Sequence, residues 1–104
     1  NHMMIVGAAQ DVQNGFVFED PVLQFVVATD FDGPAPGEPD RDFHTVRVFG
    51  ETLGKQVAAQ LAAGQRVLVS GRLRLVPQYE QATTKYYHFP VVHVHEGSGF
   101  VRCV

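Results

Sequence analysis

The stretch FHTVRVFG, residues 43–50, decides the fold of this 104-residue sequence. Its residues alternate as in a strand whose one face packs into a core. One face carries His44, Val46 and Val48, and the other carries Phe43, Thr45, Arg47 and Phe49. Arginine is rarely buried without a partner, so the second face is expected at the surface. The stretch therefore predicts an exposed face that combines aromatic rings with positive charge.

The flanking sequence predicts four more strands and one helix. Residues 4–8 and 22–29 are apolar runs typical of strands, and the first is followed by turn-forming residues at 11–15. Residues 52–63 have a helical period, with Thr52 as a plausible N-cap and Gly64 as the stop. Residues 66–75 and 86–95 return to strand patterns, separated by a polar loop at 77–84.

The expected order is thus three strands, a helix and two strands, in a single domain of residues 4–104. An all-β, five-stranded Greek-key barrel with one helix between strands three and four is the OB-fold. A sandwich would need more strands, and a split βαβ fold a second helix. Residues 1–3 resemble a cloning remnant that precedes a native start at Met4, and they are left out of the expected fold.

Charge is divided unevenly along the chain, whose formal net charge is −3. Residues 1–42 hold eight acidic residues against Arg41 alone, and five of these acids lie in the loop expected at 30–42. Residues 43–104 hold seven basic residues against three glutamates. The second part of the chain is therefore basic enough to attract a polyanion, although the whole is acidic.

Several classes of function are disfavoured. No apolar run is long enough to cross a membrane, and the single cysteine, Cys103, fits a reducing compartment such as the cytoplasm. No nucleophile and base stand at a catalytic spacing, and there is no phosphate-binding glycine motif, so neither an enzyme nor a cofactor is expected. His93 and His95 could share a metal, but His88 is a poor third ligand and no metal site is expected.

Four pieces of sequence carry a family resemblance: Ile5–Gly7 with Asp11, Phe25–Thr29, Phe43–Gly50 and Leu61–Leu73. In this order the chain resembles bacterial-type single-stranded DNA-binding proteins over residues 4–95. The third piece is similar to the family's aromatic-His-x-Val-x-x-Phe/Trp-Gly strand, and the fourth to its Leu-x-x-Gly-x-x-Val-x-Val-x-Gly-x-Leu block. The resemblance implies sequence-independent binding of single-stranded DNA in replication, recombination or repair, in the cytoplasm at the nucleoid.

The same resemblance implies a homo-oligomer, a tetramer or a dimer, with His44 near the subunit interface. The sequence also departs from the family. It has no tryptophan for the DNA face, its loop after the fourth strand differs, and it stops at Val104 without the acidic, Phe-ended tail that recruits repair and replication enzymes. Recruitment of those enzymes is therefore not expected unless a tail has been removed.

Single strands bind where aromatic faces stack on bases and cations follow the phosphates. The candidate DNA-binding residues meet that description, and for each of them an ordinary role in the core or on the solvated surface remains open. They are Phe43, Thr45, Arg47, Phe49, Lys55, Arg72, Arg74, Tyr79, Lys85 and Tyr86. Two other functions also remain open: an OB-fold protein-interaction module of the primosomal type, which the acidic loop favours, and RNA binding.

Overall fold

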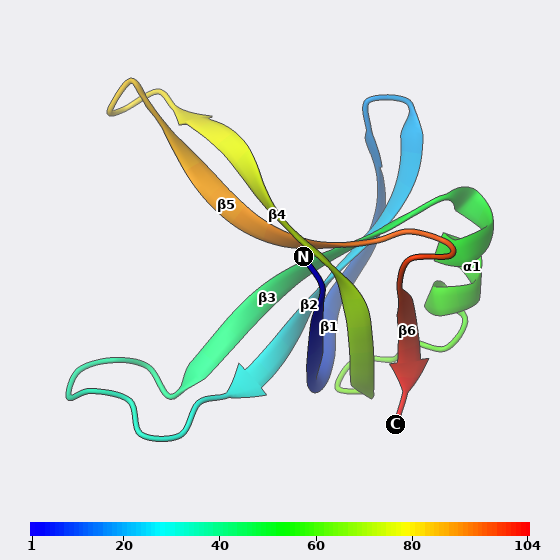
Figure 1. Ribbon diagram of the computed structural model, residues 1–104, viewed down its shortest axis with the longest axis horizontal. Coiled ribbons are helices and arrows are strands. Elements are labelled where there is room, and N and C mark those ends of the chain that lie inside the picture. Colours follow the sequence, from blue (N-terminus) through cyan, green and yellow to red (C-terminus); the bar gives the residue numbers. More distant parts are fainter.

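The computed structural model describes all 104 residues and contains six strands and one helix (Figure 1). The helix, α1, spans Glu51–Ala58 and lies between the third and fourth strands. The strands are β1 (Met3–Val17), β2 (Asp20–Asp30), β3 (Arg41–Phe49), β4 (Arg66–Glu80), β5 (Lys85–Val94) and β6 (Phe100–Cys103). The helix is not long and apolar enough to cross a membrane.

Five of the strands close into a ring. β1 pairs with β2, β2 with β3, β3 in parallel with β5, β5 with β4, and β4 with the first part of β1. This closed order, with one helix between β3 and β4, confirms the predicted OB-fold barrel. Within the ring, the two parts of β4 have different partners: residues 66–71 pair with β1, and residues 72–80 pair with β5.

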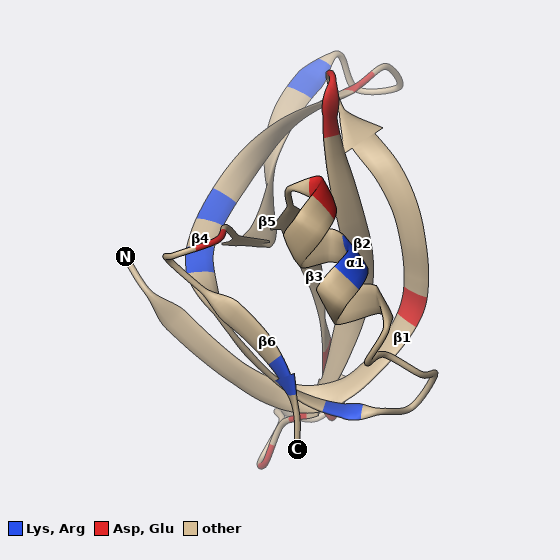
Figure 2. Ribbon diagram, turned by 90° about the vertical axis from the view of Figure 1, so that its right-hand side faces the viewer, with Lys and Arg blue, Asp and Glu red and all other residues tan.

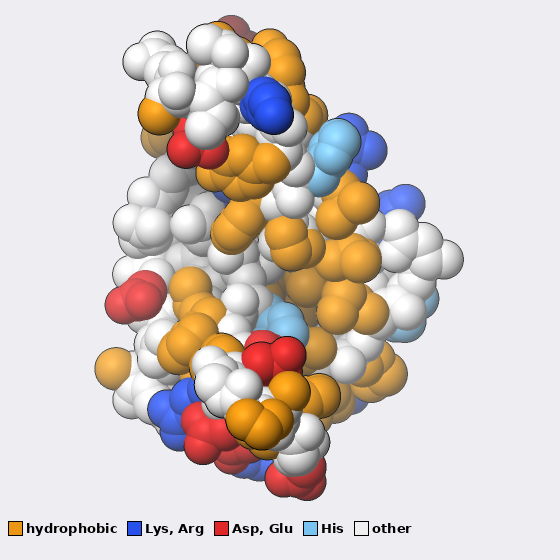
Figure 3. All heavy atoms as spheres, turned by 90° about the vertical axis from the view of Figure 1, so that its left-hand side faces the viewer, with side chains coloured by type: hydrophobic (Ala, Val, Ile, Leu, Met, Phe, Trp, Pro, Cys, Tyr) orange, Lys and Arg blue, Asp and Glu red, His pale blue; other side chains and the backbone are white.

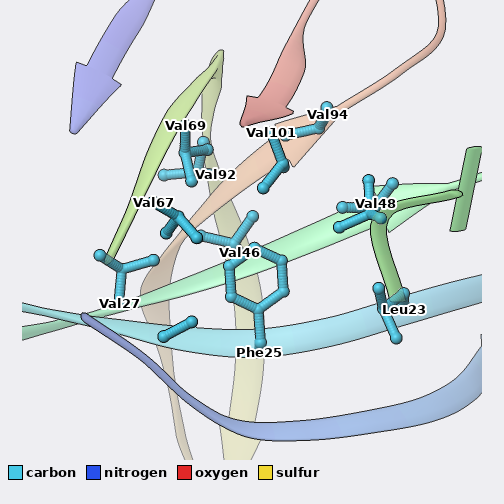
Figure 4. Packing of buried hydrophobic residues seen from close by; sticks show 12 residues of the cluster. Leu23, Phe25, Val27, Val46, Val48, Val67, Val69, Val92, Val94 and Val101 are labelled. Atoms are coloured by element: carbon cyan, nitrogen blue, oxygen red, sulfur yellow. The ribbon is translucent and has the colours of Figure 1, made fainter. Parts of the chain in front are cut away.

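The barrel is filled by a core made largely of valine (Figure 4). β-Branched residues suit the pleated surface of a strand, which explains why valines predominate on the inner faces of β3, β4 and β5. The largest core side chain is Phe25 of β2, which is fully buried. Val46 and Val48 of β3 are also fully buried, so the inner face predicted from the alternation in residues 43–50 is confirmed.

Helix α1 lies across one end of the barrel (Figure 2) and buries Val57 in the core. It is shorter than predicted and begins one residue earlier. Gly50, with a φ of 99°, is the N-cap in place of Thr52, because its left-handed conformation turns the chain directly out of β3. The helix ends at Ala58 rather than at residue 63, since backbone hydrogen bonds join Gly64 and Gln65 to β1.

Two hairpins are longer than predicted. β1 does not turn at residues 11–15: it bulges at Asp11, which has a φ of 54°, and pairs with β2 as far as Val17. β4 likewise continues to Glu80, so Tyr79 lies in a strand rather than in a loop. In both hairpins the partner strand provides backbone hydrogen bonds to residues whose own propensity favours a turn.

The chain beyond the predicted fifth strand adds a short sixth strand. β6 pairs with residues 67–70 of β4 and places Val101 in the core. Its four residues follow Gly97 and Gly99, and a strand this short leaves almost no periodic signal. At the other terminus Met3 lies in β1, and the Nε2 atom of His2 is 2.7 Å from the Oγ atom of Ser70, so these residues contact the barrel.

Three arms project from the barrel (Figure 1). They are the β1–β2 hairpin, the β4–β5 hairpin, and the loop of residues 31–40 between β2 and β3. Figure 3 shows acidic side chains gathered at the bottom of one face, where the β2–β3 loop projects, and apolar side chains between this loop and the β4–β5 hairpin.

Candidate nucleic-acid interface

Strand pairing brings three arginines from two distant strands, β3 and β4, onto one face. Arg47 of β3 lies directly across from His93 of β5, and His93 lies directly across from Arg72 of β4. In the next row Val91 of β5 lies between Thr45 and Arg74. Residues directly opposite one another in a sheet point to the same side. We call the surface formed by Arg47, Arg72, Arg74 and His93 the cationic face.

Polar partners hold two of these arginines in place. Arg47 donates from Nε to Oε1 of Gln24 on β2, at 3.0 Å. Arg72 donates from Nη2 to Oγ of Ser98, in the turn before β6, at 3.4 Å. Neither arginine forms an ion pair with an acidic residue. Their charge is therefore not neutralised within the chain and is available to an anion.

His93 lies among these positive charges. Burial lowers the pKa of His93, and repulsion from His95, Arg47, Arg74 and Arg72 lowers it further. Its Nε2 atom is buried and has no hydrogen-bond partner. The neutral imidazole thus separates the arginines without adding to their mutual repulsion.

The two phenylalanines of β3 lie at opposite ends of this face. Phe43 is 60% exposed, at the end of β3 next to the acidic loop. Phe49 is half-buried: its ring stacks on His95, with centroids 4.6 Å apart and planes inclined by 3°, and also packs against His93 at 4.7 Å. Phe43 therefore has a ring free to stack, whereas Phe49 is already engaged with two histidines.

The tyrosines predicted for the interface lie on a different face. Tyr79 and Tyr86 are directly opposite each other in the β4–β5 hairpin, with ring centroids 5.1 Å apart. Tyr79 is an odd number of residues from Arg72 along the same strand, so it points to the other side of the hairpin. Lys85 lies directly opposite Glu80 in the β4–β5 strand pairing, near the hairpin tip, and points to the same side as the arginines.

Two further predicted residues lie away from the cationic face. Lys55 of α1 forms an ion pair with Glu51 at 3.0 Å and lines a hollow of about 280 Å³ between the helix and the β1–β2 hairpin. His44 lies on the inner side of β3, where its Nε2 atom is 2.8 Å from Oγ1 of Thr29. Its position at a subunit interface stays a prediction.

Sequence reasoning missed three residues that the fold adds to this site. Gln24 positions Arg47, His93 lies between β3 and β4, and His95, just beyond the end of β5, stacks on Phe49. The sequence pattern of the two histidines suggested a metal site and not a place in this interface. The alternation of His93, Val94 and His95 could have indicated an outward-facing histidine pair. What it could not reveal is the parallel pairing of β5 with β3 that brings the pair beside Phe49.

Comparison with known proteins agrees with this fold. Residues 2–104 match the family described as the MP81-like, OB fold domain. The chain belongs to this OB-fold family. The OB-fold is typical of binding domains, which agrees with the expectation that the chain is not an enzyme. A search of curated proteins finds no significant sequence match.

Among solved structures, the Plasmodium falciparum SSB complex with ssDNA resembles this chain with a TM-score of 0.81. The two share 18% sequence identity, and the similarity covers 100% of this chain and 94% of the other. At this level of identity the similarity concerns the fold. It extends over the whole MP81-like OB-fold domain.

Proposed function

We propose that the chain binds single-stranded DNA without sequence preference across the cationic face. The observation that carries this proposal is the row of Arg47, His93 and Arg72 across β3, β5 and β4. Arginines that have no acidic partner and lie side by side suit the repeating phosphates of a nucleic-acid backbone. Phe43 and the Phe49 ring cluster border the same face and provide aromatic surface for bases.

The position of this face within the fold also supports the proposal. OB-folds commonly hold oligonucleotides on the face of their second and third strands, between the loops that join strands one to two and four to five. Arg47 of the cationic face belongs to the third strand. Here these loops are the tips of the β1–β2 and β4–β5 hairpins. The P. falciparum protein of the same fold is bound to ssDNA in its solved structure.

The acidic loop does not oppose binding at the arginines. Apart from Asp42, its acidic residues lie beyond Arg41, which is six positions from Arg47 along β3 and therefore about 20 Å away. Asp42 is five positions from Arg47 on the same strand and therefore points to the opposite side. The Debye length at physiological ionic strength is about 8 Å, so the repulsion of phosphates at Arg47 is strongly screened. Asp30 is in addition paired with Arg41 at 3.4 Å. Only Phe43, at the end of β3, comes close to the loop.

A titration with labelled oligo-dT at two salt concentrations tests the proposal. We expect binding at low salt and a steep loss of affinity as salt rises, because phosphate contacts release counterions. Oligo-dT and oligo-dC should bind within about a factor of ten of each other if stacking rather than base-edge recognition dominates. Absence of any binding at low salt would contradict the proposal, and preference for a matching oligo-rU would redirect it to RNA.

Within the cell we assign this activity to DNA replication, recombination or repair in the cytoplasm, at the nucleoid. We also propose a homo-oligomer, a tetramer or a dimer, with His44 close to the interface. Light scattering of the purified protein tests the oligomer, and a strict monomer would contradict it. Alternatively the domain could act in replication restart as a protein-interaction module.

One observation favours that second function. The face of the β4–β5 hairpin opposite the arginines exposes large apolar side chains: Leu73, Leu75, Tyr79 and Tyr86 are each at least 40% exposed. Exposed apolar surface of this kind is typical of protein interfaces. Deleting residues 33–39 of the acidic loop discriminates: tighter DNA binding favours a loop that limits access to DNA, and loss of a co-purifying protein favours the interaction module.

A further inference from the structure

The ring of Phe49 is not free to receive a base. His95 covers one of its faces in a nearly parallel stack, with centroids 4.6 Å apart, and His93 packs against it at an inclination of 54°. Phe49 itself is half-buried between these rings. A nucleobase that approaches from the side of Arg72 and Arg74 therefore meets the imidazole of His95 before it meets Phe49.

His95 lies where two hollows of the surface meet. One, of about 490 Å³, is lined by Arg72, Arg74 and His93, and the other, of about 410 Å³, is lined by Phe49, Glu51 and Glu96. His95 is the one residue that lines both hollows. A ligand that extends from one hollow to the other must cross its ring.

We propose that His95, backed by Phe49, is a base-stacking residue of the interface. This inference rests on the proposed binding of single-stranded nucleic acid and specifies how that site receives a base. Two stacked rings form a deeper aromatic platform than either ring alone, and aromatic rings, histidine included, accept unpaired bases of any sequence. The underlying Phe49 acts as a positioning residue that keeps the imidazole flat.

The charges around His95 set the path of the nucleic-acid backbone. Arg72 and Arg74 of β4 and His93 of β5 face it from one side, and Asp20, Glu51 and Glu96 line the hollow on the other. Phosphates are attracted to the first side and repelled from the second. The nucleotide whose base stacks on His95 therefore directs its phosphate towards Arg72 and Arg74.

A purely structural role would make His95 a cover for Phe49 and nothing more. Two substitutions separate these roles. His95→Leu keeps an apolar side chain of similar size over Phe49 but removes the ring, whereas His95→Phe keeps a ring. Both remove the imidazole nitrogens and any charge, so a difference between them reports the aromatic face alone.

Fluorescence anisotropy with labelled oligo-dT at low salt measures the effect, and circular dichroism melting checks that each variant folds. We expect His95→Leu to bind about tenfold more weakly than the wild type, and His95→Phe to bind within about twofold of it. His88→Leu, which changes an exposed histidine on the other side of the β4–β5 hairpin, should leave the affinity unchanged.

The outcomes distinguish this inference from the proposed function. If the wild type binds and His95→Leu binds equally well, the stacking role is wrong while the proposed function stands. If both variants lose affinity equally, the imidazole acts through its nitrogens or charge, and stacking is again wrong. If the wild type itself fails to bind DNA or RNA at low salt, the proposed function is contradicted and this inference with it.

Discussion

Arg47 donates a hydrogen bond to the side-chain oxygen of Gln24, its direct neighbour across β2 and β3, at 3.0 Å. The bond uses Nε and leaves the two terminal nitrogens of the guanidinium without a protein partner. An arginine held in this way loses less conformational freedom when it contacts a phosphate. In the proposed interface, Gln24 thus orients Arg47.

We expect Arg47→Ala to weaken binding of oligo-dT. We also expect the plot of log affinity against log salt to become less steep, by the amount that corresponds to the loss of about one phosphate contact. Gln24→Ala should weaken binding by a smaller factor, with the slope unchanged, because the charge remains. Titrations at four salt concentrations measure both quantities. A wild-type slope in Arg47→Ala would show that this residue contacts no phosphate.

Substitution of Arg72 or Arg74 should affect DNA affinity differently from substitution of Arg102, the arginine of β6. Arg102 lies over the ring of Phe100, 4.3 Å from its centroid, on a strand outside the five-stranded ring. Arg72→Ala and Arg74→Ala are each expected to reduce affinity several-fold, and Arg102→Ala to leave it unchanged, although all three variants lose the same charge. Equal losses in all three would mean that net charge, rather than the cationic face, governs binding.

Gly7 allows β1 to approach β2 closely. A Cβ atom at this position would overlap the backbone carbonyl oxygen of Ala28, whereas one at Gly15 in the same strand would meet nothing. We expect Gly7→Ala to lower the free energy of unfolding by about 2 kcal/mol, since neither backbone can move without opening the barrel. Gly15→Ala should leave it within about 0.5 kcal/mol of wild type. Urea denaturation measures both, and equal stabilities would contradict the close approach.

The lowered pKa of His93 predicts a loss of stability in acid. A histidine whose pKa is lower in the folded chain binds its proton mainly in the unfolded chain, so stability falls as the pH drops below the ordinary histidine value. When the pH is lowered from about 7.5 to about 5, the melting temperature of His93→Gln should fall less than that of the wild type. His88→Gln, at an exposed position, is the control and should follow the wild type. A parallel loss in all three proteins would contradict this prediction.

The local pattern of the sequence was enough to predict the barrel and part of its site. Phe43 and Arg47 share a strand face because the pleat repeats every two residues, which depends on no distant contact. The extent of the hairpins was not predictable in the same way. Tyr79 stands in a polar stretch that favours a loop, and it becomes part of β4 only because Tyr86 and its neighbours pair with it.

By itself, the sequence determined the order of the first five strands and the helix, the valine-rich inner faces and the face that each residue of β3 occupies. All of these follow from local periodicity and propensity. Only the tertiary structure decided that β5 lies between β3 and β4, which places His93 between Arg47 and Arg72 and stacks His95 on Phe49. Strand neighbours and register arise from closing the barrel around one core, and the spacing of residues along the chain carries no direct record of that closure.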